Sequence, residues 1–115
     1  MRTVKEVFEH HVKALNEGNF DEVAADYGEQ GFLFAKEYGV VKGREAIKGG
    51  FETLMSGPLV GAKFDITTMI IEDDIVYIEW SAQGTQNVAT GTDTFVIRDG
   101  QIHAQTVKFL SLGPR

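Results

Sequence analysis

Hydrophobic residues near the start of the chain recur every three or four positions, which is the spacing of one face of a helix. The members of this stripe are Val4, Val7, Phe8, His11, Val12 and Leu15. They predict an amphipathic helix over about residues 3–17, which Gly18 stops. Asn19 or Asp21 can cap a short second helix that continues through Tyr27.

A strand-like segment and a third helical pattern follow. The stretch GFLFAKEYGVVKG has the composition of strands, and Gly39 inside it indicates a turn between two short ones. Helical spacing returns in the stretch REAIKGGFETLM, whose Gly49 and Gly50 weaken the helix. We expect this glycine pair to mark close packing against a neighbouring element. The apolar positions of the third helix are Ala46, Ile47, Phe51, Leu54 and Met55.

The second half of the chain consists of four segments rich in β-branched and aromatic residues. They are AKFDITTMII, IVYIEWSAQG, VATGTDTFVIR and QIHAQTVKFLSL. The breaks at residues 72–74, 84–87 and 99–100 suit successive antiparallel hairpins. Helices followed by a meander of strands predict an α+β fold rather than a βαβ fold. No repeat or linker divides the 115 residues, so we expect one domain over residues 1–115.

Charge and composition narrow the classes of partner. Seventeen acidic residues against eleven Lys and Arg give a net charge of −6 without any basic run, which argues against nucleic acid and anionic membranes as partners. The chain has no cysteine, and His10 and His11 diverge by about 100° on a helix, so we expect no metal site and no cofactor. The start MRTVKEVFEHH is too charged for a signal-peptide core, and a cytoplasmic location is the expectation.

Two ionisable residues lie on apolar faces. Asp93 shares a strand face with Phe95 and Ile97, and His11 lies within the helical stripe, whereas His10 faces away from it toward solvent. Each of the two is either a core residue satisfied by one hydrogen bond or a polar group on the wall of a pocket. In the last strand His103, Gln105, Val107 and Phe109 share a face, but both faces are mixed in polarity.

Four stretches resemble the nuclear transport factor 2-like superfamily, in its SnoaL-like and ketosteroid-isomerase-like branches. They are ALNEGNFDEVAADY, GVVKGREAIKGGFETL, TDTFVIRDGQI and AQTVKF. The resemblance covers nearly the whole chain and implies a cystatin-like cone, in which N-terminal helices pack on a curved, mainly antiparallel sheet that encloses an apolar pocket. Such folds serve enzymes, ligand binders and dimerisation modules alike.

Alignment with ketosteroid isomerases implies roles for single residues. Asp93 matches a carboxylic acid that those enzymes keep protonated in an oxyanion hole, and His11 matches the tyrosine of that hole. Ala35 stands where the proton-abstracting aspartate would be, so that base is absent. Phe51 replaces a supporting tyrosine, and Tyr27 keeps an aromatic ring there.

The resemblance therefore implies a pocket for a small hydrophobic molecule, with His11 and Asp93 as acid–base groups, either paired with each other or acting as a ligand clamp. The expected ligand contacts are Tyr27, Phe51, Trp80, His103, Gln105 and Phe109. Three functions stay open: an isomerase, cyclase or hydrolase for an apolar carbonyl or epoxide, a non-catalytic ligand binder, or an interaction module.

We also expect a homodimer. The sheet face opposite the pocket carries apolar residues where a solvated face would be polar. The residues assigned to that outer face are Tyr77, Val96, Ile102 and Ala104.

Overall fold

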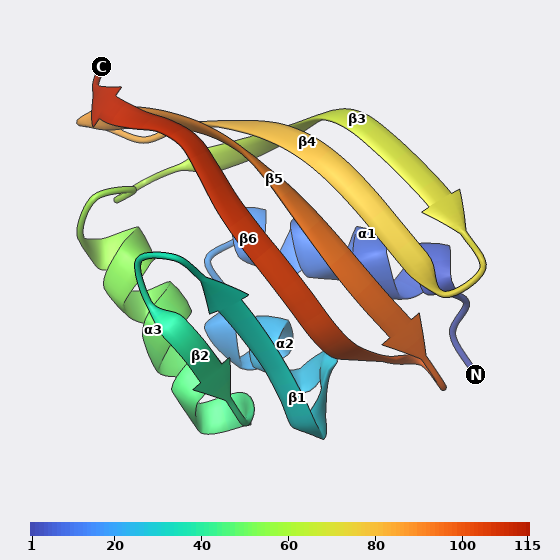
Figure 1. Cartoon of the computed structure of the whole chain (residues 1–115). Helices are drawn as coiled ribbons and strands as arrows, with labels where there is room; N and C mark the ends of the chain where they lie inside the picture. Colours follow the sequence, from blue (N-terminus) through green and yellow to red (C-terminus); the bar gives the residue numbers. More distant parts are fainter.

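The computed structural model describes all of residues 1–115 and has the predicted α+β architecture. Its sheet has the strand order β2-β1-β6-β5-β4-β3, and only β1 and β6 pair in parallel. Figure 1 shows the sheet curving around α1, with α2 and α3 on the same, concave side. None of the helices has the length and the apolar character of a membrane-spanning segment. The elements are α1 (Val4–Asn16), α2 (Phe20–Ala25), β1 (Tyr27–Ala35), β2 (Gly39–Lys42), α3 (Arg44–Ser56), β3 (Lys63–Glu72), β4 (Ile75–Gln83), β5 (Asn87–Arg98) and β6 (Gln101–Pro114).

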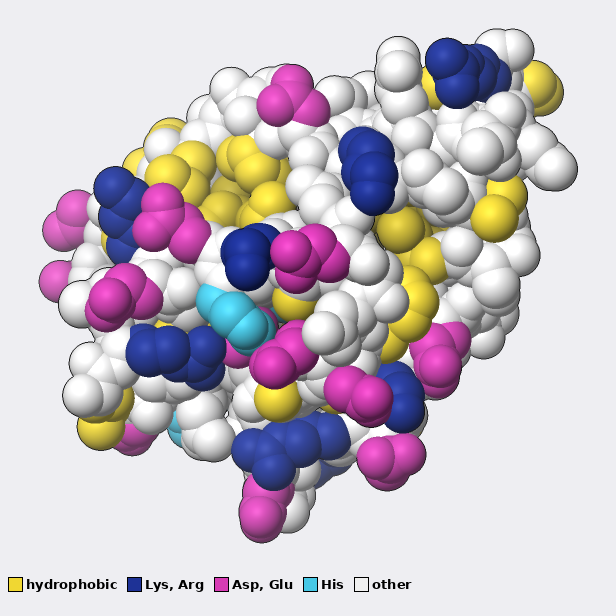
Figure 2. Space-filling view, turned by 180° about the vertical axis from the view of Figure 1, so that it is seen from behind, with side chains coloured by type: hydrophobic (Ala, Val, Ile, Leu, Met, Phe, Trp, Pro, Cys, Tyr) yellow, Lys and Arg dark blue, Asp and Glu magenta, His cyan; other side chains and the backbone are white.

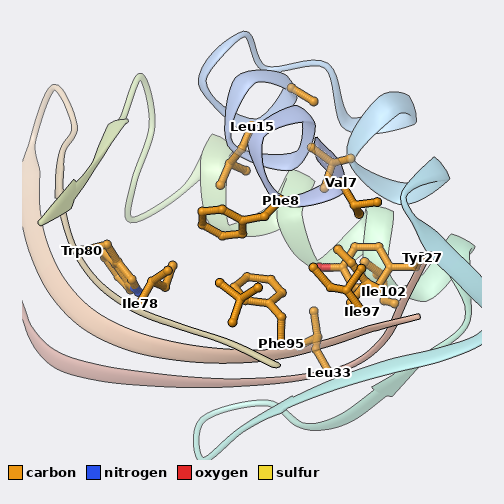
Figure 3. Packing of buried hydrophobic residues seen from close by; sticks show 14 of the residues in the cluster. Val7, Phe8, Leu15, Tyr27, Leu33, Ile78, Trp80, Phe95, Ile97 and Ile102 are labelled. Atoms are coloured by element: carbon orange, nitrogen blue, oxygen red, sulfur yellow. The ribbon is translucent and has the colours of Figure 1, made fainter. Parts of the chain in front are cut away.

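Helix α1 begins at a capping box. The Thr3 side chain accepts from the Glu6 backbone N–H while the Glu6 carboxylate accepts from the Thr3 N–H, which satisfies two donors that the first turn would otherwise leave free. After the helix, Gly18 takes the left-handed conformation with φ of +69°. The apolar stripe of the helix is buried against the concave face of the sheet, and Figure 3 shows Phe8 above Phe95 there.

Two expectations for the helices are wrong. Helix α2 ends at Ala25, and Tyr27 opens strand β1, because the Asp26 carbonyl accepts from the Ile102 N–H at 2.7 Å and so ties the chain to β6. Gly49 and Gly50 do not mark close packing, since a Cβ atom at either position would meet no atom within 4 Å. The space beside each glycine is open, and beside Gly50 it belongs to a cavity between α3 and the sheet.

A β-bulge in the last hairpin changes which residues of β6 face inward. Val96 pairs with Ala104 and Ile97 with Ile102, so His103 is an extra residue on its strand. As a result Ile102 is fully buried and His103 is exposed. The expectations that Ile102 lies on the outer face and that His103 lies inward are both wrong, because the simple alternation of β6 breaks at this residue.

A polar cluster fastens the N-terminus to the sheet. The Asp26 carboxylate is only 1% exposed, and it accepts from Arg2 Nη1 at 2.8 Å and from His10 Nδ1 at 2.7 Å. Arg2 Nη2 also donates to the Gly100 carbonyl in the turn between β5 and β6. The expectation that His10 is simply solvated is therefore wrong. Figure 2 shows acidic and basic side chains intermixed over the helix side of the molecule.

Candidate ligand-binding cavity

A cavity of about 110 Å³ lies between the concave face of the sheet and helices α1 and α3. Seventeen of its 21 lining residues are hydrophobic, so the wall offers little to a polar ligand. The remaining four are Gly50 and three polar residues, namely His11, Asp93 and Gln105. The chemistry of the cavity therefore depends on those three side chains.

Strand register places Asp93 between two nitrogen donors. Asp93 pairs with Ile78 of β4 and with Val107 of β6, so Trp80 and Gln105 are its diagonal neighbours on the same face. Trp80 Nε1 donates to Oδ1 of Asp93 at 2.9 Å, and Gln105 Nε2 donates to Oδ2 at 2.9 Å. Both carboxyl oxygens are thus held by uncharged groups.

A glycine opposite Trp80 makes this arrangement possible. Gly91 pairs with Trp80, and the indole ring occupies the space that a Cβ atom at residue 91 would need. Any side chain there would push the ring off the strand, because the Lys108 carbonyl crowds the same position. Gly91 therefore allows the indole N–H to reach Asp93.

Tyr27 extends the hydrogen-bond chain behind the cavity wall. Its hydroxyl donates to Oε1 of Gln105, whose amide N–H in turn donates to Asp93. Tyr27 is fully buried and does not line the cavity, so the cavity geometry does not support the prediction that it contacts a ligand directly. Figure 3 shows its hydroxyl oxygen directed into the interior. Burial raises the pKa of Tyr27 well above its ordinary value, so the hydroxyl keeps its proton.

Burial also shifts the acid–base equilibrium of Asp93. It raises the pKa of this carboxyl from 3.8 to about 6, while the hydrogen bonds from Trp80 and Gln105 act in the opposite direction. No cation lies against the carboxyl to stabilise its charged form. Asp93 is therefore a carboxyl group that titrates close to neutral pH inside an apolar cavity.

His11 lines the same cavity but has no hydrogen bond to Asp93. Its ring contacts Tyr27, Phe51 and Phe95 edge to face, with centroids 5.8, 6.0 and 5.5 Å apart. Its Nδ1 atom is enclosed and has no hydrogen-bond partner. Burial lowers the pKa of His11 to about 4, so the ring is uncharged at neutral pH. The structure thus brings His11 and Asp93 to one cavity without making them a pair.

The other expected site residues divide into two groups. Phe51, Trp80 and Phe109 line the cavity together with His11, Asp93 and Gln105, whereas His103 and Tyr27 do not. Ala35 also lines the wall, with a methyl group where the resemblance places a catalytic base. That these residues bind a ligand stays a prediction.

Sequence reasoning missed residues at the mouth of the cavity. Tyr38 lines it although its side chain is 51% exposed, and Gly50 lines it from α3. Tyr38 lies in the turn between β1 and β2, where no periodicity reveals which way a side chain points. Gly50 has no side chain at all, so its part in the cavity follows only from the path of the helix.

Residues 8–105 match the family model of the SnoaL-like domain. The chain belongs to the SnoaL-like family. No curated protein sequence matches it. Among solved structures, this SnoaL-like protein is similar to SalBIII, an epoxide hydrolase/cyclase-like enzyme with a role in pyran ring formation in the polyether salinomycin. That match has 17% identity and a TM-score of 0.84, and covers 97% of this chain and 95% of the other.

Two further structures have the same fold. An LEH-like epoxide hydrolase of M. tuberculosis is 20% identical with a TM-score of 0.72, over 90% of this chain and 79% of the other. An NTF2-like protein of unknown function from Cytophaga hutchinsonii is 17% identical with a TM-score of 0.79, over 95% of this SnoaL-like chain and 91% of its own. Identities at this level establish the fold and leave the activity to the site itself.

Proposed function

We propose that the protein binds a small, largely apolar molecule in the cavity and that Asp93 is the acid–base group that acts on it. The observation that carries the proposal is the state of Asp93. It is the one carboxyl on the cavity wall, both its oxygens accept from uncharged donors, and burial brings its pKa to about 6. A group that titrates near the working pH is suited to proton transfer.

At neutral pH Asp93 is mostly ionised, and its part in a reaction is that of a proton acceptor. With an epoxide, water attacks a ring carbon, the ring C–O bond breaks, and Asp93 takes a proton from the attacking water while solvent protonates the released oxygen. With a ketone, Asp93 takes a proton from the carbon beside the carbonyl, the electron pair of that C–H bond moves into an enolate, and the carbon then takes a proton from solvent. The similarity in fold to two epoxide hydrolase-like proteins supports the first reaction.

Two assays test the activity. Purified protein is incubated with styrene oxide, and diol formation is followed by chromatography. It is also incubated with 1-tetralone in deuterated water, and exchange beside the carbonyl is followed by NMR. We expect one of the two reactions with the parent protein and a loss of about 100-fold or more in Asp93→Asn, since an amide cannot take the proton. Activity that survives in Asp93→Asn would contradict the assigned role.

A non-catalytic ligand binder is the second candidate, and one observation favours it. The cavity holds a single group that can take a proton at neutral pH, because Ala35 supplies only a methyl group and the pKa of His11 is about 4. A binder would show a ligand-dependent rise in melting temperature without turnover in either assay.

We also propose that two copies pair through the outer face of the sheet. Tyr77, Val96 and Ala104 are half-buried on that face. Phe32 and Phe34 lie beside them with stacked rings whose centroids are 6.2 Å apart, and Phe34 is 44% exposed. A standard interface buries about 1,600 Å² in total. Light scattering tests the proposal: we expect a dimer for the parent and a monomer for Phe34→Glu, and a monomeric parent would refute it.

A further inference from the structure

The hydrogen bonds around Asp93 all run in one direction. The indole N–H of Trp80 can only donate, so Oδ1 of Asp93 accepts. The Tyr27 hydroxyl donates to Oε1 of Gln105, which leaves the amide N–H of Gln105 to donate to Oδ2. The bond from Trp80 and the series from Tyr27 through Gln105 both end on Asp93. The protein therefore holds this side chain as a hydrogen-bond acceptor.

Asp93 has acceptor capacity left over on the cavity side. A carboxylate offers about four lone-pair sites, and Trp80 and Gln105 use one on each oxygen. Asp93 lines the cavity, where the two other lining residues with an N–H or O–H group outside this network, His11 and Tyr38, make no hydrogen bond to it. A ligand that brings a hydrogen-bond donor to this carboxylate would satisfy the group directly. A ligand with only acceptor atoms, such as an epoxide or a ketone, would face it with lone pairs against lone pairs unless a donor such as the attacking water lies between them.

The rest of the wall sets the charge of the ligand. No Lys or Arg lines the cavity, and His11 is uncharged at neutral pH, so nothing there balances an anion. A cationic ligand would have to give up its hydration among aromatic and aliphatic side chains, with one carboxylate as its only charged partner. An uncharged molecule avoids both costs.

We propose that the cavity selects an apolar, uncharged molecule with a hydroxyl group, an alcohol, phenol or diol, whose O–H donates to Asp93, and that Gln105, held by Tyr27, is the positioning residue that keeps Asp93 an acceptor. The inference rests on the binding part of the proposed function and specifies the chemical group that meets Asp93. It differs from the resemblance to ketosteroid isomerases, which implies a protonated Asp93 that donates to a ligand oxygen.

The pH dependence of this selectivity should follow the titration of Asp93. The groups packed toward it are His11 from α1, Tyr27 from β1, Trp80 from β4 and Gln105 from β6, and the residues of α3 on the wall carry no charge. The pKa of His11 is about 4 and that of Tyr27 is far above neutral. Between about pH 5 and pH 8 Asp93 is thus the group that changes its charge, with a pKa of about 6.

Three naphthalenes of one shape test the proposal: 2-naphthol carries the donor, 2-methylnaphthalene carries no polar atom, and 2-methoxynaphthalene carries an acceptor alone. Their dissociation constants are measured by equilibrium dialysis with the parent and with Asp93→Ala. The ratio of the 2-methylnaphthalene constant to the 2-naphthol constant is compared between proteins, which cancels the different solubilities of the probes. We expect this ratio to fall at least about tenfold in Asp93→Ala, since hydrogen bonds to charged groups are the stronger ones.

A matched control changes the apolar wall alone. Leu54→Ala should shift the affinity for 2-naphthol and 2-methylnaphthalene together and leave their ratio within about twofold, because residue 54 lines the cavity from α3 without a polar atom and outside the hydrogen bonds of Asp93. Gln105→Leu should lower the ratio in the same direction as Asp93→Ala and move the midpoint of its pH profile upward, since the lost hydrogen bond is one that lowers the Asp93 pKa. A merely structural role of Gln105 would leave that midpoint in place.

The outcomes separate the two proposals. If the probes bind the parent but Asp93→Ala leaves the ratio unchanged, or if 2-methoxynaphthalene binds the parent as tightly as 2-naphthol, the hydroxyl selectivity is wrong and the binding function stands. Tighter binding of the charged 2-naphthylmethylammonium would also overturn it. If no probe binds the parent, both proposals fail. Should Asp93→Ala not fold, the parent decides, because the ratio must fall between about pH 7.5 and pH 5 as Asp93 takes up a proton.

Discussion

Two buried carboxyl groups of this molecule have opposite surroundings. Asp26 is 1% exposed and is paired with Arg2 and His10, and through Arg2 it is linked to the turn at Gly100. Asp93 is 9% exposed and accepts from the uncharged nitrogens of Trp80 and Gln105 alone. The same side chain is neutralised in one place and left with its charge uncompensated in the other.

This difference separates a structural group from a candidate for chemistry. The oxygens of Asp26 are occupied by Arg2 and His10, and the cluster joins the N-terminal segment, α1 and the start of β1. The carboxyl of Asp93 instead borders an open cavity and keeps unused lone pairs. A buried charge without a countercharge lowers the stability of the fold, so its place on a cavity wall points to a use there.

Removal of the partners of Asp26 should give the largest change in stability. In the double variant Arg2→Ala/His10→Ala the buried Asp26 carboxylate loses both partners, and we expect the free energy of unfolding in urea to fall by about 4 kcal/mol. The binding ratio for 2-naphthol and 2-methylnaphthalene should not change, because the cluster lies outside the cavity.

The matched control for this experiment is another ion pair of α1. Lys13 and Glu17 lie 3.7 Å apart with both side chains exposed, and Lys13→Ala should cost no more than about 0.5 kcal/mol. If the double variant is as stable as Lys13→Ala, the partners of Asp26 do not stabilise the fold and the structural role assigned to this carboxyl is wrong.

Sequence patterns predicted the elements well and the Asp26 cluster not at all. The hydrophobic stripe gives α1 its buried face, and the turn signals at residues 73–74 and 99–100 give the hairpins, with positive φ at Asp73, Asp99 and Gly100. His10 and Asp26 are sixteen residues apart, and helical periodicity shows only that His10 leaves the stripe. The partner that it meets depends on where α2 ends.

The cavity shows the same division between pattern and tertiary detail. Period-two alternation together with the resemblance puts Trp80, Gln105 and Phe109 on the inner face, where the structure has them. The alternation fails at His103, because a bulge of one residue exchanges the inner and outer faces of β6 before residue 104. No sequence pattern in β6 predicts this bulge. Nor does periodicity show that Gln105 and Trp80, rather than His11, bind Asp93, since that depends on strand register.

The pH dependence of stability should distinguish the two ionisable residues of the cavity. The pKa of His11 falls from 6.5 to about 4 on folding, so between these values the unfolded chain holds more protons and acid lowers the free energy of unfolding. The pKa of Asp93 rises from 3.8 to about 6, so between these values the folded protein holds more protons and acid raises it. Each contribution is about 3 kcal/mol over its range, at 1.36 kcal/mol for one pKa unit.

Substitution of one residue at a time should expose these opposed slopes. Relative to the parent, His11→Leu should gain stability as the pH falls from about 6.5 to about 4, and Asp93→Asn should lose stability over about pH 6 to pH 4. Urea unfolding across this range measures both, and the difference from the parent removes the contributions of surface carboxylates. Profiles parallel to the parent in both variants would show that neither residue is titrated as a buried group.

The smallest expected effect concerns two neighbouring glycines of helix α3, only one of which lines the cavity. Gly49 and Gly50 both lie inside α3, and neither has an atom within 4 Å of the position of a Cβ. Alanine at either residue should therefore raise the free energy of unfolding by about 1 kcal/mol through helix propensity. Only Gly50 lines the cavity, so Gly50→Ala adds a methyl group at its mouth and should weaken the binding of 2-methylnaphthalene, whereas Gly49→Ala should not. Equal affinities in two equally stabilised variants would mean that the ligand does not enter past Gly50.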